Sequence, residues 1–106
     1  MLPTAITNIT NEILNTVDVS KIYLFGSYAR GTQNAQSDYD FFVVISNGTM
    51  RPLEAMQKIY CSLAESPMPV PVDILASCEK DFEERRLLPA SIERTIQDEG
   101  VLLYGN

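Results

Sequence analysis

The chain contains no histidine and no tryptophan, and it has only two cysteines among its 106 residues. The lack of histidine argues against a zinc site, since imidazole is one of the commonest zinc ligands. Cys61 and Cys78 have neither the short spacing of a metal-binding motif nor the number needed for a disulfide framework. We therefore expect a reduced, cytoplasmic protein.

Positive charge is also scarce. Eight Lys and Arg residues face 14 Asp and Glu residues, which gives a net charge of −6. This balance argues against nucleic acid held on a broad basic face, because such binding depends on neutralising phosphates. An acidic surface would suit a basic protein partner, or it could simply keep a small protein soluble. No apolar run approaches the ~20 residues of a membrane span, and the N-terminus lacks a signal peptide pattern, so we expect no membrane contact.

The length is enough for one hydrophobic core and too short for two, so we expect a single domain over residues 1–106. Helical and strand periodicities alternate along the chain and predict an α/β (α+β) domain with a small mixed sheet and packed helices. The predicted helices are residues 2–17, Leu53–Ala64, Lys80–Leu88 and Ile92–Glu99. The predicted strands are Ile22–Phe25, Phe41–Ile45 and Val72–Leu75, and Val101–Tyr104 is expected to be a short terminal strand or an extended tail.

Each helix is expected to bury one face. In the first helix the inward residues are Leu2, Ile6, Ile9, Ile13 and Val17, and in the second they are Leu53, Met56, Ile59, Tyr60 and Leu63, with Cys61 in the core or at its boundary. Phe82, Leu87 and Leu88 form the apolar stripe of the third. Ser91 and Gly100 are suitable caps for the fourth, and Asp18–Ser20 are predicted to form a turn.

The stretch Lys21–Ile45 dominates the functional interpretation. Its first apolar run ends at Gly26-Ser27, which predicts a tight turn from a buried strand into a short helix. At such a turn glycine lets the backbone approach a ligand closely, and the free amides together with the Ser27 hydroxyl favour a phosphate. On its own, a Gly-Ser pair is more often only a turn.

Two carboxylates follow ten residues later. Asp38 and Asp40 are two residues apart at the head of the next strand, so we expect their side chains to share one face of the sheet. Paired carboxylates repel each other, and a hard divalent cation relieves that repulsion. The alternative is the solvated side of an edge strand. Asp is a poor strand residue, however, and here it leads directly into the most apolar run of the chain.

Gly26-Ser27, ten residues, and Asp38-Tyr39-Asp40 resemble the G-S-x10-D-x-D signature of the polymerase-beta-like nucleotidyltransferase superfamily. The longer strings F-G-S-Y-A-R-G-T and S-D-Y-D-F-F-V-V resemble its minimal nucleotidyltransferase (MNT) branch, which is often paired with a HEPN-domain toxin. The resemblance implies transfer of AMP from ATP with Mg²⁺ as the metal ion. The acceptor would be a tyrosine of a HEPN ribonuclease toxin, and this chain would be the antitoxin.

The resemblance also implies a third carboxylate from a later strand, which helps to deprotonate the attacking hydroxyl. Asp73, between Val72 and Ile74, is the matching residue, so Asp38, Asp40 and Asp73 are the expected catalytic and metal-binding residues. The alternative for Asp73 is a solvent-facing residue of an exposed strand. Gly26, Ser27 and Arg30 are expected at the nucleotide, although Arg30 could equally pair with a nearby acid.

Two other functions are compatible with the sequence. The chain could neutralise a toxin by binding alone, although a pure binder has no need of three converging acids. It could also modify a small molecule. That reading is weakened because the chain is too short to hold a separate acceptor-binding domain.

Overall fold

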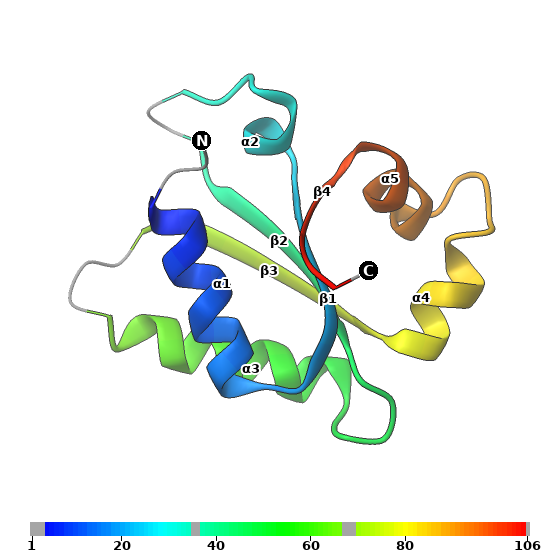
Figure 1. Ribbon diagram of the computed structural model, residues 1–106, viewed down its shortest axis with the longest axis horizontal. Coiled ribbons are helices and arrows are strands. Elements are labelled where there is room, and N and C mark those ends of the chain that lie inside the picture. The colour runs from blue at the N-terminus through cyan, green and yellow to red at the C-terminus, as the bar shows by residue number, and fades with distance from the viewer. Residues whose placement is uncertain (1–3, 35–36, 67–69, 106) are drawn as a thin grey trace.

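The computed structural model describes residues 4–34, 37–66 and 70–105. Helices and strands alternate along this part of the chain, and every helix in it is too short or too polar to cross a lipid bilayer. The elements are α1 (Thr4–Thr16), β1 (Val19–Phe25), α2 (Ser27–Arg30), β2 (Tyr39–Ile45), α3 (Pro52–Ala64), β3 (Val72–Cys78), α4 (Glu79–Arg85), α5 (Ile92–Glu99) and β4 (Val101–Tyr104) (Figure 1).

The four strands form one mixed sheet in the order β3-β2-β1-β4. β1 runs antiparallel to both of its neighbours, whereas β2 and β3 are parallel. Parallel neighbours cannot be joined by a tight hairpin, and α3 provides the required crossover between them. The mixed sheet with its packed helices confirms the predicted α/β fold class.

Helices α1 and α3 cover one face of the sheet, which we call the closed face (Figure 1). Ile13 of α1 and Ile59 of α3 are both 0% exposed there. The strands contribute alternate residues to this core, because successive side chains point to opposite faces. These strand residues are Ile22, Leu24, Phe41, Val43, Ile45 and Ile74. The predicted first helix is confirmed by its buried Ile6, Ile9 and Ile13, while Leu2 lies outside the described residues.

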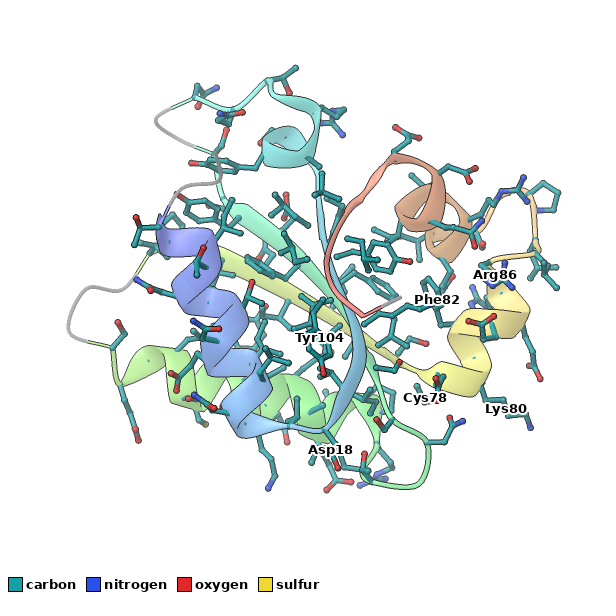
Figure 2. The ribbon with its side chains drawn as sticks, in the orientation of Figure 1. Asp18, Cys78, Lys80, Phe82, Arg86 and Tyr104 are labelled. Carbon is teal, nitrogen blue, oxygen red and sulfur yellow. The ribbon has the colours of Figure 1, made fainter. Side chains whose placement is uncertain are left out.

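Helices α4 and α5 pack on the other face, which we call the open face and which carries Tyr23, Asp40, Phe42, Val44 and Asp73. Phe82 of α4 is 1% exposed (Figure 2). The centroid of its ring lies 5.8 Å from the ring centroids of both Tyr23 and Phe42. This second core is smaller than the first. The two helices leave part of the open face uncovered, since Asp73 and its neighbour Leu75 on β3 are exposed.

The last helix follows its predicted limits. α5 spans Ile92–Glu99, and the Ser91 hydroxyl accepts a hydrogen bond from the Arg94 amide as an N-cap should. α4 is shorter than predicted and ends at Arg85. The same Ser91 hydroxyl donates to the Arg85 carbonyl at 2.5 Å and so ties the end of α4 to the start of α5. Leu87 and Leu88 therefore lie in a turn and are exposed, and their predicted place in an apolar stripe is wrong.

Three further predictions need correction. The predicted turn at Asp18–Ser20 is wrong, because β1 already begins at Val19, which pairs with Ile45. Leu53 is 64% exposed, because Ala55 and Ile59 set the inward side of α3. Cys61 is also exposed, since it is two residues from Ile59 and helix residues at that spacing do not share a face.

Candidate functional site

Asp40 and Asp73 lie directly opposite each other on adjacent strands. They are register partners in the parallel pairing of β2 with β3, so their side chains emerge on the same face of the sheet. On its other side Asp40 is paired with Phe25, the last residue of β1. The two carboxylates predicted from separate parts of the sequence are therefore side by side on the open face, where β1 ends and β2 begins.

Asp38 lies immediately before the first residue of β2. β2 begins at Tyr39, so Asp38 precedes the strand and its side chain is exposed. Its charge still raises the pKa of Asp40, so its carboxylate remains within electrostatic reach of the pair.

Gly26 connects β1 to α2 at the edge of this group. It has φ 74° and ψ −153°, a backbone conformation that only glycine adopts readily. A Cβ atom at this position would collide with the Asp40 carboxylate. Glycine is therefore required here both for the shape of the turn and for the closeness of the backbone to Asp40. The predicted strand–turn–helix is confirmed, with α2 starting at Ser27.

The electrostatics of the site centre on Asp40. Burial raises the pKa of its carboxyl above the ordinary value of 3.8, and the charges of Asp73 and Asp38 and a hydrogen bond with Asp73 raise it further. Arg30 acts in the opposite direction and lowers the pKa. Negative charge is thus concentrated at the turn between strand and helix, where a cation would relieve it.

Arg30 is exposed at the end of α2. Among the described residues it forms no ion pair with an acid, whereas the other four arginines each form one. Its effect on the pKa of Asp40 places its guanidinium near the carboxylates. The structural alternative considered for Arg30, pairing with a neighbouring acid, has no ion pair to support it within the described part of the chain.

An aromatic contact at the site was not foreseen. Tyr28 of α2 and Tyr39 of β2 stack with their ring centroids 4.1 Å apart and their planes inclined by 20°. A hydrogen bond to Tyr28 raises the pKa of the Tyr39 hydroxyl, and burial adds to the effect. The pair ties α2 to the start of β2 and so connects the Gly26-Ser27 turn to Asp38 and Asp40. Two tyrosines within the motif were visible in the sequence, but no periodicity signals that rings from a helix and a strand will meet.

The fit of a divalent cation can be judged from these carboxylates. Among the residues that the structure describes, no three His, Cys, Asp or Glu side chains form a ready-made metal cluster. The oxygens of Asp40 and Asp73, with Asp38 nearby, nevertheless supply the hard ligands that Mg²⁺ prefers. Mg²⁺ usually binds through one or two carboxylates and takes further oxygens from substrate phosphates and water. The donor set therefore fits this metal ion when part of its shell comes from a nucleotide.

Solved structures of other proteins share this fold. A Sulfolobus solfataricus protein assigned to the nucleotidyltransferases superposes with a TM-score of 0.64 at 19% identity, over 95% of this chain and 78% of that one. A toxin–antitoxin solved with AMP-PNP gives a TM-score of 0.59 at 26% identity, over 94% of this chain and 73% of that one. A variant of the toxin–antitoxin MntA-HpeT gives 0.58 at 26% identity, over 100% and 75%.

No curated protein matches this sequence significantly. The family model of the nucleotidyltransferase domain, in contrast, matches residues 6–103. That span contains the Gly26-Ser27 turn, both strands that carry the paired carboxylates, and the helices on both faces of the sheet. The chain therefore belongs to the nucleotidyltransferase domain family.

Proposed function

We propose that this chain transfers AMP from ATP, with Mg²⁺, to a tyrosine hydroxyl of a HEPN ribonuclease toxin and acts as the antitoxin of that toxin. The observation that carries the proposal is the pairing of Asp40 with Asp73 beside the positive-φ turn at Gly26. A solvated strand edge does not require a glycine whose backbone lies against one of two facing carboxylates. A site that binds a cation beside a phosphate needs this close approach of backbone and carboxylate.

Each residue has a role that follows from its position. The turn at Gly26 and the Ser27 hydroxyl bind the triphosphate, and Arg30 contacts a phosphate oxygen. Asp73, which is exposed at the edge of the site, accepts the proton of the acceptor hydroxyl. The acceptor oxygen then forms a bond to the α-phosphorus while the bond from that phosphorus to the pyrophosphate oxygen breaks.

Asp38, Asp40 and Asp73 would hold the metal, which when bound neutralises charge on the phosphate oxygens. The raised pKa of Asp40 supports this assignment, because the fold holds like charges together at a cost that a cation offsets. Tyr28 and Tyr39 keep the phosphate-binding turn and the carboxylates in register with each other.

The choice of acceptor rests on likeness to relatives. A protein 26% identical to this chain was solved as a toxin–antitoxin with AMP-PNP, an ATP analogue. Another solved structure, also 26% identical, is of a variant of the toxin–antitoxin MntA-HpeT. The uncovered part of the open face gives a protein side chain access to Asp73, since neither α4 nor α5 buries it.

The test is incubation of this chain with ATP labelled at the α-phosphate, Mg²⁺ and the toxin encoded beside its gene. We expect label on a tyrosine of the toxin, release of pyrophosphate and loss of ribonuclease activity. Asp40→Asn should lower the transfer rate by at least about 10³-fold, because it removes a charged group that acts only in the site. Asp18→Asn, an exposed acid at the other end of β1, is the matched control and should transfer at the wild-type rate (Figure 2).

Two results would contradict the proposal. Toxin neutralisation that survives both Asp38→Asn and Asp40→Asn, without label on the toxin, would show that the chain acts by binding alone. Label that appears on a small molecule and never on the toxin would show a different acceptor.

A further inference from the structure

The strand that carries Asp73, β3, lies at the edge of the sheet, and no other described strand pairs with its outer side. On its inner side the Tyr39 amide donates to the Pro71 carbonyl at 3.0 Å. In a parallel ladder the residues that face the partner strand alternate with those that face away. The backbone groups of Asp73 are therefore directed toward β2, and those of Ile74 are directed to the free edge.

The hydroxyl of Tyr60 on α3 meets both of these edge groups. It accepts a hydrogen bond from the Ile74 amide at 2.7 Å and donates to the Ile74 carbonyl at 3.5 Å. A single side-chain oxygen thus occupies a place that a further strand or water would otherwise take. Tyr60 is 39% exposed as a whole residue, so burial of the side chain does not explain its position.

We infer that Tyr60 is a positioning residue, whose hydroxyl holds the Asp73–Ile74 segment of β3 and thereby sets the place of the Asp73 carboxylate against Asp40. The inference rests on the proposed function, in which Asp73 takes the proton of the acceptor. β2 holds the segment from the inner side and Tyr60 holds it from the outer side. Without the hydroxyl, the Ile74 amide and carbonyl would bond only to water, while the Ile74 side chain stays packed in the core of the closed face.

This arrangement places the effect on one step of the reaction. The phosphate-binding turn and Asp40 belong to β1, α2 and β2, which Tyr60 does not contact through its hydroxyl. Asp73 is one of three carboxylates proposed to hold the metal, so a loosened β3 should slow proton removal by Asp73 much more than it weakens the binding of ATP. Small displacements of a reacting group have large effects on rate, because catalysis depends on orientation.

The experiment compares Tyr60→Phe with wild type in two measurements. The first is amide hydrogen exchange without nucleotide. Ile74 should exchange about three- to tenfold faster in the variant, as expected for one lost hydrogen bond, and Asp73 should also exchange faster. The second is transfer of label from ATP to the toxin. Here kcat should fall about three- to tenfold while KM for ATP stays within about twofold.

Tyr104→Phe is the matched control. Tyr104 lies on β4, the opposite edge strand, and is similarly exposed (Figure 2). This variant loses the same atom at the same kind of edge and should leave Ile74 exchange and kcat unchanged. A loss of kcat in both variants would show a general effect of tyrosine removal and would overturn the inference.

The remaining outcomes separate this inference from the proposed function. Unchanged exchange at Ile74 would overturn it, and so would faster exchange with unchanged kcat. Transfer that is absent from the wild-type protein would overturn the proposed function instead. In that case the hydrogen-exchange rates alone would test the role of Tyr60. Faster exchange at Asp73 and Ile74 in Tyr60→Phe than in wild type would support the restraint by the hydroxyl, and unchanged exchange would refute it.

Discussion

The closed and open faces of the sheet are built from alternate residues of the same strands, yet they differ in what they contain. On the closed face, α1 and α3 bury aliphatic side chains along the strands, including Ile22, Leu24, Val43 and Ile74. On the open face, α4 and α5 gather a smaller aromatic cluster around Phe82. Beyond this cluster the open face carries Asp40 and Asp73 in place of apolar residues.

The difference between the faces shows how one small sheet supports both stability and chemistry. Burial of apolar surface on the closed face is the main source of folding free energy. The open face carries facing carboxylates whose repulsion and partial burial cost free energy. The strands connect the two, because Phe41 in the closed core directly follows Asp40. The closed face therefore fixes the backbone that holds the acids together.

The largest loss of stability should follow from removing a buried side chain from the core of the closed face. Ile59→Ala removes a side chain that is 0% exposed and leaves a cavity between α3 and the sheet, which should cost about 2–5 kcal/mol in the free energy of unfolding. Chemical denaturation measures the change. Leu53→Ala on the same helix is the control, since Leu53 is 64% exposed and should change stability by less than about 0.5 kcal/mol. Similar losses in both variants would show that α3 does not pack as described.

A smaller loss is expected at the turn beside the carboxylates. Gly26→Ala should destabilise the protein by about 1–3 kcal/mol, because its φ is positive and the new methyl group meets the Asp40 carboxylate. Gly31→Ala tests a milder backbone strain without a collision, since Gly31 has ψ 19° in the left-handed helical region where Gly26 has ψ −153°. Gly31 has the same φ of 74°, but a Cβ there would meet no atom within 4 Å. Denaturation midpoints should rank wild type above Gly31→Ala and Gly31→Ala above Gly26→Ala. Equal midpoints for the two variants would refute the contact with Asp40.

The closed face was easier to predict from the sequence than the open one. Helical spacing of Ile6, Ile9 and Ile13, and the continuous apolar run at Phe41–Ile45, report burial directly. Strand alternation also placed Asp40 and Asp73 in separate strands, and the resemblance to nucleotidyltransferases suggested that they meet. Their register as direct partners depends on how β2 and β3 align across α3, which local patterns do not encode.

What the sequence could not give were contacts between side chains of different elements. Tyr60 seemed to belong to the inward stripe of α3, yet its hydroxyl reaches past the helix to the edge of β3. Leu87 and Leu88 looked like core residues, but the hydroxyl of Ser91 ends α4 before them. Such contacts arise from the packing of complete elements, and apolar spacing within one element carries no information about them.

The contact that limits α4 can be tested at Ser91. Ser91→Ala removes the acceptor for the Arg94 amide and the donor to the Arg85 carbonyl, and should cost about 1–2 kcal/mol in the free energy of unfolding. Ser91→Thr retains the hydroxyl and is the control, with an expected loss of less than about 0.5 kcal/mol. The effect should be confined to the open face, so amide exchange should rise in α5 and stay unchanged in α1. Equal exchange in both helices would contradict the separation of the two faces.

The smallest effect on stability has the opposite sign. Asp40 has a raised pKa in the folded protein, so the folded state holds its proton more tightly than the unfolded state does. Stability is therefore lost as the pH rises from the ordinary value of 3.8 through the raised pKa, and the loss persists at higher pH. Asp40→Asn removes this titration, and its amide can still donate a hydrogen bond to Asp73. At pH 7 the variant should melt about 1–3 °C higher than wild type while its transfer activity is lost.

The pH dependence of that difference gives the sharper measurement. The gap in melting temperature between Asp40→Asn and wild type should close below pH 3.8, where Asp40 is protonated in both states, and should reach its full size above the raised pKa. A gap independent of pH would mean that Asn stabilises the strand by packing or hydrogen bonding alone. A gap that opens with pH and closes again when Mg²⁺ is added to wild type would show that like charge on the open face destabilises the fold until a cation binds.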